Sequence, residues 1–232
     1  MPLKLYKLDL SPPVCAALMI CDIHNVPVEM VDVDLFNKDH LKPEYLEKNP
    51  LHTIPLLEDG DLFIHDSHVI LTYLTEVYGK DDSLYPKDPK KRALVDQKLF
   101  FDNLLFNRAR NITYAALFEG VRKPPQKFMN DLVEVYEFIE AFLSKTKFIA
   151  GDNMSVADIS IVSSVIKMDV IINMYFIKSN NSEIYDKKEV EKRNIEELLA
   201  KSNVDTATVP PNNQTFMISY NYERNLSSAL DL

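Results

Sequence analysis

The amino end of the sequence places a hydroxyl where a helix begins, a position that suits the binding of an anion. Ser11 is followed by Pro12-Pro13 and the apolar run VCAALMIC, which predicts a buried helix with proline in its first turn. Free N–H groups and the helix dipole favour negative charge at such an end, so the Ser11 hydroxyl can donate a hydrogen bond to a bound anion. The alternative is that Ser11 merely caps the helix.

Two further stretches carry polar groups or a proline at an element boundary. Asp66 and Ser67 open the helical pattern SHVILTYLTEVY, where they can cap the helix, bind a ligand, or do both. Ile54-Pro55 begins a strand, and a cis bond there would leave the N–H and C=O of Ile54 free to bind a peptide ligand. An ordinary trans proline at a strand start is the alternative for that pair.

Other kinds of site are not indicated. His24, His65 and His68 lack the paired spacing of a zinc site, so no metal is expected. Ser-Pro-Pro lacks the glycines of a nucleophile elbow, and no phosphate-cradling loop is seen among only four glycines. Cys15 and Cys21 share one apolar helical stretch that keeps them apart, so we expect both thiols to be reduced, as in the cytosol.

The amino-acid composition and net charge limit the kinds of molecule that the protein can bind. With 232 residues, of which 46% are hydrophobic, the chain can fill a substantial core. Its 26 basic residues against 35 acidic ones give a net charge of −9, which repels a phosphate backbone and argues against nucleic acid. Lys167 and Asp169 interrupt the longest late apolar stretch, and the first residues contain no long apolar run. We therefore expect a cytoplasmic protein without a membrane partner.

The elements that position these residues follow from hydrophobic periodicity. The first part predicts strand, helix, strand, short helix, two strands joined by an Asp-Gly turn, and a helix, in the order βαβαββα. The corresponding segments are residues 3–7, 14–21, 28–35, 40–49, 54–66 and 67–78.

The second part is predicted to be all-α. Residues 80–90 are charged and carry two prolines, which is typical of a linker. Periodic helical segments follow at 91–119, 125–143 and 155–172, the last opened by a capping box of Ser155 and Asp158. A last helix at 183–200 and a loose tail complete the prediction. The predicted division is residues 1–80, a linker at 81–90, and an all-α domain with a divergent tail at 91–232.

This arrangement resembles the glutathione transferases, whose first domain is thioredoxin-like and whose second is helical. The resemblance covers residues 3 to about 172 and rests on three motifs in the right order: Ser11-Pro12-Pro13, the segment NPLHTIP at 49–55, and Asp66-Ser67-His68. Together they are similar to the insect delta/epsilon pattern, and the Asp-Ser-His variant with FDNLLF at 101–106 favours epsilon. The resemblance implies a homodimer. The sequence departs from the family pattern at Cys15, where arginine is usual, and in having no tryptophan.

The resemblance also implies an activity and roles for individual residues. The enzyme would conjugate the thiolate of glutathione, its co-substrate, to small hydrophobic electrophiles in detoxification, with the Ser11 hydroxyl stabilising the thiolate. The same thiolate can reduce peroxides or remove chloride. The start of the helix at 67–78 would bind the γ-glutamyl end, the cis-proline turn would bind the cysteinyl part, and two histidines would bind the glycyl carboxylate. The implied glutathione-binding residues are Ser11, His40, His52, Thr53, Ile54, Pro55, Asp66, Ser67 and His68.

The second substrate is expected to lie against the first long helix of the α domain. Aromatic and polar residues recur there every four positions and predict one stripe, either a pocket wall or part of the core or of a dimer interface. The predicted pocket residues are Pro13, Asn103, Phe106, Asn107, Arg110, Tyr114 and Phe118. Two other functions fit the same stripe and the unusual tail: a non-catalytic carrier of steroids or other lipophiles, and an interaction domain.

Overall fold

The computed structural model describes residues 2–9, 11–119, 121 and 125–176, with the backbone alone for 116–118 and 167–176. The first unit contains β1 (Leu3–Lys7), α1 (Pro12–His24), β2 (Val28–Asp32), η1 (Asp39–Leu41), α2 (Pro43–Leu46), β3 (Leu56–Asp59), β4 (Leu62–Ile64) and α3 (Ser67–Tyr78). The second contains α4 (Pro89–Phe118), α5 (Gln126–Leu143) and α6 (Val156–Phe176). The predicted helix at 183–200 and the tail lie outside the described residues.

The four strands form one mixed sheet in the order β2-β1-β3-β4. β1 pairs with β2 in parallel, whereas β1–β3 and β3–β4 are antiparallel. Gly60 makes the hairpin turn between β3 and β4 with φ +64, a left-handed conformation that favours glycine. This arrangement confirms the predicted βαβαββα order and the thioredoxin-like class.

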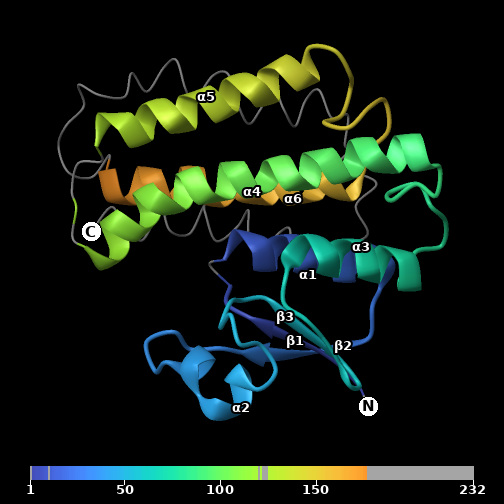
Figure 1. Ribbon diagram of the computed structural model, residues 1–232, viewed down its shortest axis with the longest axis vertical. Helices are drawn as coiled ribbons and strands as arrows, with labels where there is room; N and C mark the ends of the chain where they lie inside the picture. Colours follow the sequence, from blue (N-terminus) through green and yellow to red (C-terminus); the bar gives the residue numbers. More distant parts are fainter. Residues whose placement is uncertain (1, 10, 120, 122–124, 177–232) are drawn as a thin grey trace, which may run out of the picture.

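Helices α1, α3, α4, α5 and α6 stack on one face of the sheet in successive layers. Figure 1 shows α1 and α3 lying between the sheet and the helices α4 and α6, with α5 farther out. α6 packs against both α1 and α4. The largest fully buried side chains include Leu5 in β1, Ile20 in α1, Leu71 in α3 and Leu105 in α4, all in a single apolar cluster. One core therefore joins the sheet unit to the helical unit.

The boundaries of the short helical segment differ from the prediction. A single helix was expected at 40–49, but the structure has a 3₁₀ turn, η1, followed by α2. Lys42 between them is extended, with φ −69 and ψ 146. Pro43 disfavours helical geometry in the residue before it, which accounts for the break at Lys42.

The first long helix starts earlier than expected. α4 begins at Pro89 instead of residue 91, because the Asp88 carboxylate accepts the N–H of Lys91 at 2.9 Å and proline fits the first helical position. Within the described residues, none of the helices is both long enough and apolar enough to span a lipid bilayer.

Candidate functional site

The Ser11 side chain is not used to cap α1. Ser11 has the extended backbone of an N-cap residue, its N–H donates to Leu8 O at 2.9 Å, and its carbonyl accepts the N–H of Cys15 at 3.0 Å. Its hydroxyl makes no capping bond, and Pro12 and Pro13 offer no N–H to accept. The half-buried hydroxyl is thus left beside the positive end of a helix dipole, which favours the anion-binding interpretation over the capping one.

The segment from Asn49 to Pro55 is tied together by side-chain hydrogen bonds. Asn49 is fully buried, and its amide donates to Thr53 O at 2.9 Å and to Thr53 Oγ1 at 3.1 Å. The Tyr45 hydroxyl donates to the same carbonyl at 2.7 Å, and Thr53 Oγ1 donates to His65 O at 3.2 Å. The Ile54–Pro55 bond is cis, as predicted. The chain therefore enters β3 in a fixed conformation.

Two histidines come together beside this segment. The rings of His40, in η1, and His52 have centroids 6.0 Å apart. His52 adopts a left-handed backbone with φ +46, and its N–H donates to Asn49 O at 2.9 Å. Nδ1 of His40 is buried and has no hydrogen-bond partner among the described residues. Burial lowers the pKa of His40, and the neighbouring imidazole lowers it further, although Asp39 opposes this.

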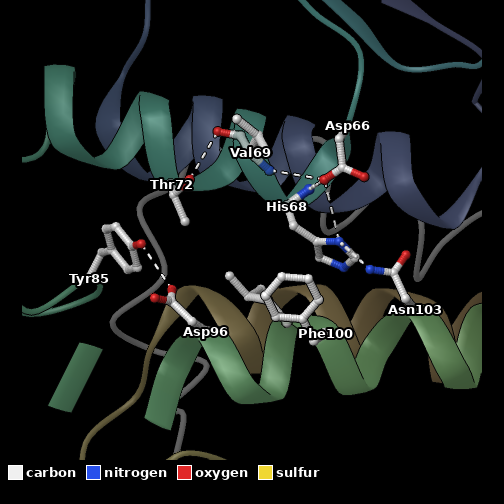
Figure 2. A pocket seen from close by; sticks show the side chains of 9 residues that line it. Asp66, His68, Val69, Thr72, Tyr85, Asp96, Phe100 and Asn103 are labelled. Carbon is white, nitrogen blue, oxygen red and sulfur yellow. Dashed lines mark hydrogen bonds and ion pairs between the residues drawn. The ribbon is translucent and has the colours of Figure 1, made fainter. Parts of the chain in front are cut away.

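Asp66 caps α3 and holds one oxygen in a fixed position. Oδ1 accepts the N–H of His68 at 3.0 Å and of Val69 at 3.2 Å, and it lies 3.5 Å from Nδ1 of His68 (Figure 2). The hydrogen bond from His68 is the main reason that the pKa of Asp66 is below its ordinary value, although partial burial opposes it. All three donors meet the same oxygen, Oδ1. Ser67, the first helical residue, is buried.

The His68 ring points toward α4 and joins three helices. Its Nε2 lies 3.0 Å from Oδ2 of Asp102, which also accepts the Ser160 hydroxyl of α6 at 2.5 Å. Nδ1 lies 3.4 Å from the amide nitrogen of Asn103. Burial alone would lower the pKa of His68, but the hydrogen bonds and charges of Asp102 and Asp66 together raise it to about 9. The imidazole is therefore a cation at neutral pH, held between two carboxylates.

Asp102 was not among the predicted site residues, although the sequence carries a signal for it. Val95, Leu99, Leu105 and Ala109 are buried at helical spacing on α4, and Asp102 falls in the middle of that apolar stripe with 3% exposure. A buried carboxylate is rarely tolerated without a cationic or hydrogen-bonding partner. The position predicts such a partner, but only the packing of α3 on α4 identifies it as His68.

The predicted second-substrate stripe divides between two environments. Phe106 packs against the core, whereas Arg110 and Tyr114 are exposed, with the guanidinium 5.6 Å from the ring centroid. Asn107 is exposed and donates to Asn103 O at 2.7 Å, and Pro13 is half-buried in the first turn of α1. The side chain of Phe118 lies outside the described part of the chain.

A cavity of about 290 Å³ lies between α3 and α4 (Figure 2). Of the predicted pocket residues whose side chains are described, Asn103 alone lines it. Its other lining residues are Asp66, His68, Val69, Thr72, Tyr85, Asp96, Leu99 and Phe100. Among the described residues, no group of three or more side chains is arranged to hold a metal ion.

Residues 5–82, which include Ser11, the cis-prolyl bond and Asp66, match the family model described as glutathione S-transferase, N-terminal domain. Glutathione S-transferase 1 of Manduca sexta is 44% identical over 174 residues, or 74% of this chain and 80% of that protein. The chain belongs to the glutathione S-transferase family. It is accordingly an enzyme, a glutathione transferase.

Solved structures place this transferase among insect enzymes. An epsilon-class glutathione S-transferase from the housefly, Musca domestica, is 45% identical, with a TM-score of 0.69, over 76% of this chain and 84% of that one. A glutathione transferase homologue of Drosophila mojavensis, solved with bound glutathione, is 35% identical, with a TM-score of 0.70, over 87% of this chain and 96% of that one. These likenesses confirm the predicted resemblance to the delta/epsilon type.

The capping box of the transferase forms with one difference from the prediction. Asp158 Oδ2 accepts the N–H of Ser155 at 2.8 Å, as expected. The Ser155 hydroxyl was expected to accept an amide at the start of α6, but it donates to the same carboxylate at 2.9 Å. Asp158 Oδ1 accepts the N–H of Ile149 at 2.8 Å. The carboxylate thus accepts from Ile149, in the loop before the capping box, as well as from Ser155, which a local motif does not reveal.

Proposed function

We propose that this transferase adds the thiolate of glutathione to small hydrophobic electrophiles, in a detoxifying role, and that Ser11 stabilises the thiolate. The observation that supports this most is the Ser11 hydroxyl, which makes no capping bond at the amino end of α1. A free thiol with a pKa of about 8.5 is mostly protonated at neutral pH. A hydrogen bond donated to sulfur, together with the helix dipole, favours the thiolate, which is the nucleophilic form.

The chemistry requires little of the protein beyond this stabilisation and the positioning of the reactants. The thiol proton leaves to solvent, the sulfur lone pair forms a bond to an electrophilic carbon, and a leaving group such as chloride departs with its bonding electrons. Ser11 keeps its proton throughout and donates a hydrogen bond that is strongest to the anionic sulfur. Holding the two reactants side by side supplies the remaining rate enhancement.

The rest of the tripeptide has complementary groups on the same unit. The α-ammonium of the γ-glutamyl residue would meet Oδ2 of Asp66, and its carboxylate would meet the N–H and hydroxyl of Ser67 at the positive end of α3. The main chain of Ile54, next to the fixed cis-proline turn, would pair with the cysteinyl residue, and Thr53 adjoins it. His40 and His52 would donate to the glycyl carboxylate, which gives the buried Nδ1 of His40 a reason to lack a protein partner.

A structure with S-hexylglutathione tests this placement, and a conjugation assay with a chlorodinitrobenzene tests the activity. We expect the ligand sulfur within hydrogen-bond distance of Ser11 Oγ and a saturable rate in glutathione. An empty cleft, or a sulfur bound far from Ser11, would contradict the proposal. Tight binding of hydrophobic dyes without any conjugation would favour the carrier function instead.

We propose as well that two copies associate through the face formed by α3 and α4. Phe100 of α4 is 77% exposed and Val69 of α3 is 51% exposed, and both line the cavity between these helices (Figure 2). Leu104, one helical turn along α4, is 39% exposed. Exposed apolar side chains gathered on neighbouring helices mark an interaction surface, and the adjacent cavity offers a recess for a partner's side chain.

Replacing Phe100 with aspartate is expected to weaken the dimer at least tenfold, because burying an unpaired carboxylate in an apolar contact costs several kcal/mol. Light scattering coupled to gel filtration across a dilution series would show the variant as a monomer where the native protein is dimeric. The Phe36→Asp variant is the control, since Phe36 is 92% exposed but lies in the loop after β2. A Phe100→Asp protein that remains dimeric at the same dilutions would exclude this face.

A further inference from the structure

A compact polar cluster connects Lys48, two residues after α2, to the sheet. Residues 39–53, which contain η1, α2 and the loop with His52, are called the α2 segment below. Lys48 Nζ donates to Glu58 Oε2 of β3 at 2.5 Å and to the Tyr6 hydroxyl of β1 at 2.6 Å. The Tyr6 hydroxyl in turn donates to the same glutamate oxygen at 2.7 Å. Lys4 of β1 approaches the other oxygen of Glu58 at 3.8 Å. The lysine ammonium also lies 4.9 Å from the centroid of the Tyr6 ring.

The charges in this cluster stabilise one another although they are partly removed from water. The Glu58 and Lys48 side chains are 10% and 28% exposed. Burial alone would raise the pKa of Glu58, but the hydrogen bonds from Lys48 and Tyr6 hold it below its ordinary value. Burial would lower the pKa of Lys48, yet its bonds to Glu58 and Tyr6 raise it. Without Glu58 and Tyr6, the Lys48 ammonium would be partly buried with no group to compensate for its lost hydration.

Apolar packing gives the α2 segment little other support. Figure 1 shows α2 on the face of the sheet opposite α1 and α3, away from the main core. Among the described residues, the apolar cluster on this side has Val33, Tyr45 and Leu56 as its buried members, with Tyr6 and Ile54 packed against it. Because so small a cluster buries little apolar surface, directional polar contacts contribute a larger share of what holds the segment in place.

Lys48 is also adjacent in sequence to the residue that organises the predicted glycyl-binding loop. Asn49, fully buried, accepts the N–H of Leu51 at 3.1 Å through its side chain and the N–H of His52 at 2.9 Å through its carbonyl. The loop that carries His52 is therefore fixed relative to Asn49. Lys48, the residue before Asn49, is in turn bonded to Tyr6 and Glu58 of the sheet. Thr53 has a second tie, its hydroxyl bond to His65 O at 3.2 Å.

We propose that Lys48, held by Glu58 and Tyr6, is a positioning residue for the glycyl half of the glutathione site. The inference rests on the proposed function and deepens it. Lys48 sets where the loop with His40 and His52 stands relative to the sheet. The γ-glutamyl subsite is fixed separately by the start of α3, and the cysteinyl subsite has further support from the bond of Thr53 to His65 and from the pairing of β3 with β1. Losing the tie should therefore weaken recognition of the glycyl carboxylate and leave the other two subsites in place.

Substitution Lys48→Met, which keeps the aliphatic stem and removes the ammonium, tests this. We expect the KM for glutathione to rise about fivefold, the loss typical of a partly exposed ion-pair network. The KM for γ-glutamylcysteine, which lacks the glycyl residue, should change by less than about twofold, as should kcat with saturating thiol. The Lys48→Arg variant should restore most of the affinity for glutathione, because arginine retains the charge and the donors.

The matched control is Lys4→Met, which removes the other lysine near Glu58 but no contact of the α2 segment, and its KM for glutathione should match that of the native protein. Glu58→Gln provides a second variant should Lys48→Met fold poorly, with the same selective loss expected. An unchanged KM for glutathione, or an equal rise for the dipeptide, would overturn this inference alone. A native protein that shows no saturation by glutathione would overturn the proposed function as well.

Discussion

The Ser11→Ala variant is expected to conjugate a chlorodinitrobenzene about 10- to 100-fold more slowly than the native protein near pH 6.5, with both substrates saturating. The variant loses the single hydroxyl at the amino end of α1 that makes no capping bond. A hydrogen bond to a charged group contributes roughly 1.5–3 kcal/mol, which corresponds to that range of rates. Initial rates of product absorbance give the measurement directly.

The pH dependence of the rate separates this role from a structural one. Without the hydroxyl, the pKa of the bound thiol should rise by about 1 to 2 units, so the deficit should shrink as the pH approaches the pKa of free glutathione. The Ser11→Thr variant keeps a hydroxyl at the same position and should retain most of the activity at low pH. A deficit that stays constant over the whole pH range would mean that Ser11 does not act on the thiol.

The Asp102→Asn variant is expected to lower the free energy of unfolding at neutral pH by about 2–4 kcal/mol, because it leaves the buried His68 cation without its main counter-charge. The native pair is 3.0 Å apart, and the side chains of His68 and Asp102 are 12% and 4% exposed. Urea denaturation at pH 7 measures the difference. The control is Asp96→Asn on the same helix, whose partner is the neutral Tyr85 hydroxyl at 2.9 Å, and its loss should stay near 1 kcal/mol.

The stability that this pair supplies should depend on pH in a defined direction. The pKa of His68 is about 9 in the folded protein, above its ordinary value of 6.5. The contribution of the pair to the free energy of unfolding is therefore fully present below about pH 6.5 and is lost as the pH rises through 9. The rise in the pKa of His68 corresponds to a loss of about 3 kcal/mol of stability between these two pH values. The difference between the native protein and Asp102→Asn should narrow over the same range, and a constant difference from pH 6 to 10 would contradict the assignment.

Two of the motifs were local, and local rules were enough for them. A proline after Ser11 and an Asp-Ser pair before an apolar helix each determine backbone geometry within three or four residues. The structure accordingly has α1 and the Asp66 cap at the predicted positions. The cis Ile54–Pro55 bond was expected from the family resemblance alone, because an X-Pro bond is usually trans. The short helix at 40–49 was mispredicted although its determinant was also local, since Pro43 restricts the residue before it.

The stripe on α4 shows where periodicity stops being informative. Residues four apart on a helix are offset by about 40° around its axis at each step. A stripe of four such residues therefore winds far enough around the helix to face different surroundings at its two ends. Phe106 therefore packs in the core while Arg110 and Tyr114 face outward. Periodicity placed these side chains near one another, but it did not establish which of them line a cavity.

The sequence by itself determined the order of the elements and the Asp66 cap of α3, because these depend on neighbours along the chain. Only the tertiary structure decided which polar groups meet: His68 with the Asp102 carboxylate, 34 residues apart, and the Lys48 ammonium with the Tyr6 hydroxyl, 42 residues apart. The cost of leaving a buried charge unpaired makes such pairings necessary, but which residues pair depends on how helices and strands pack in space.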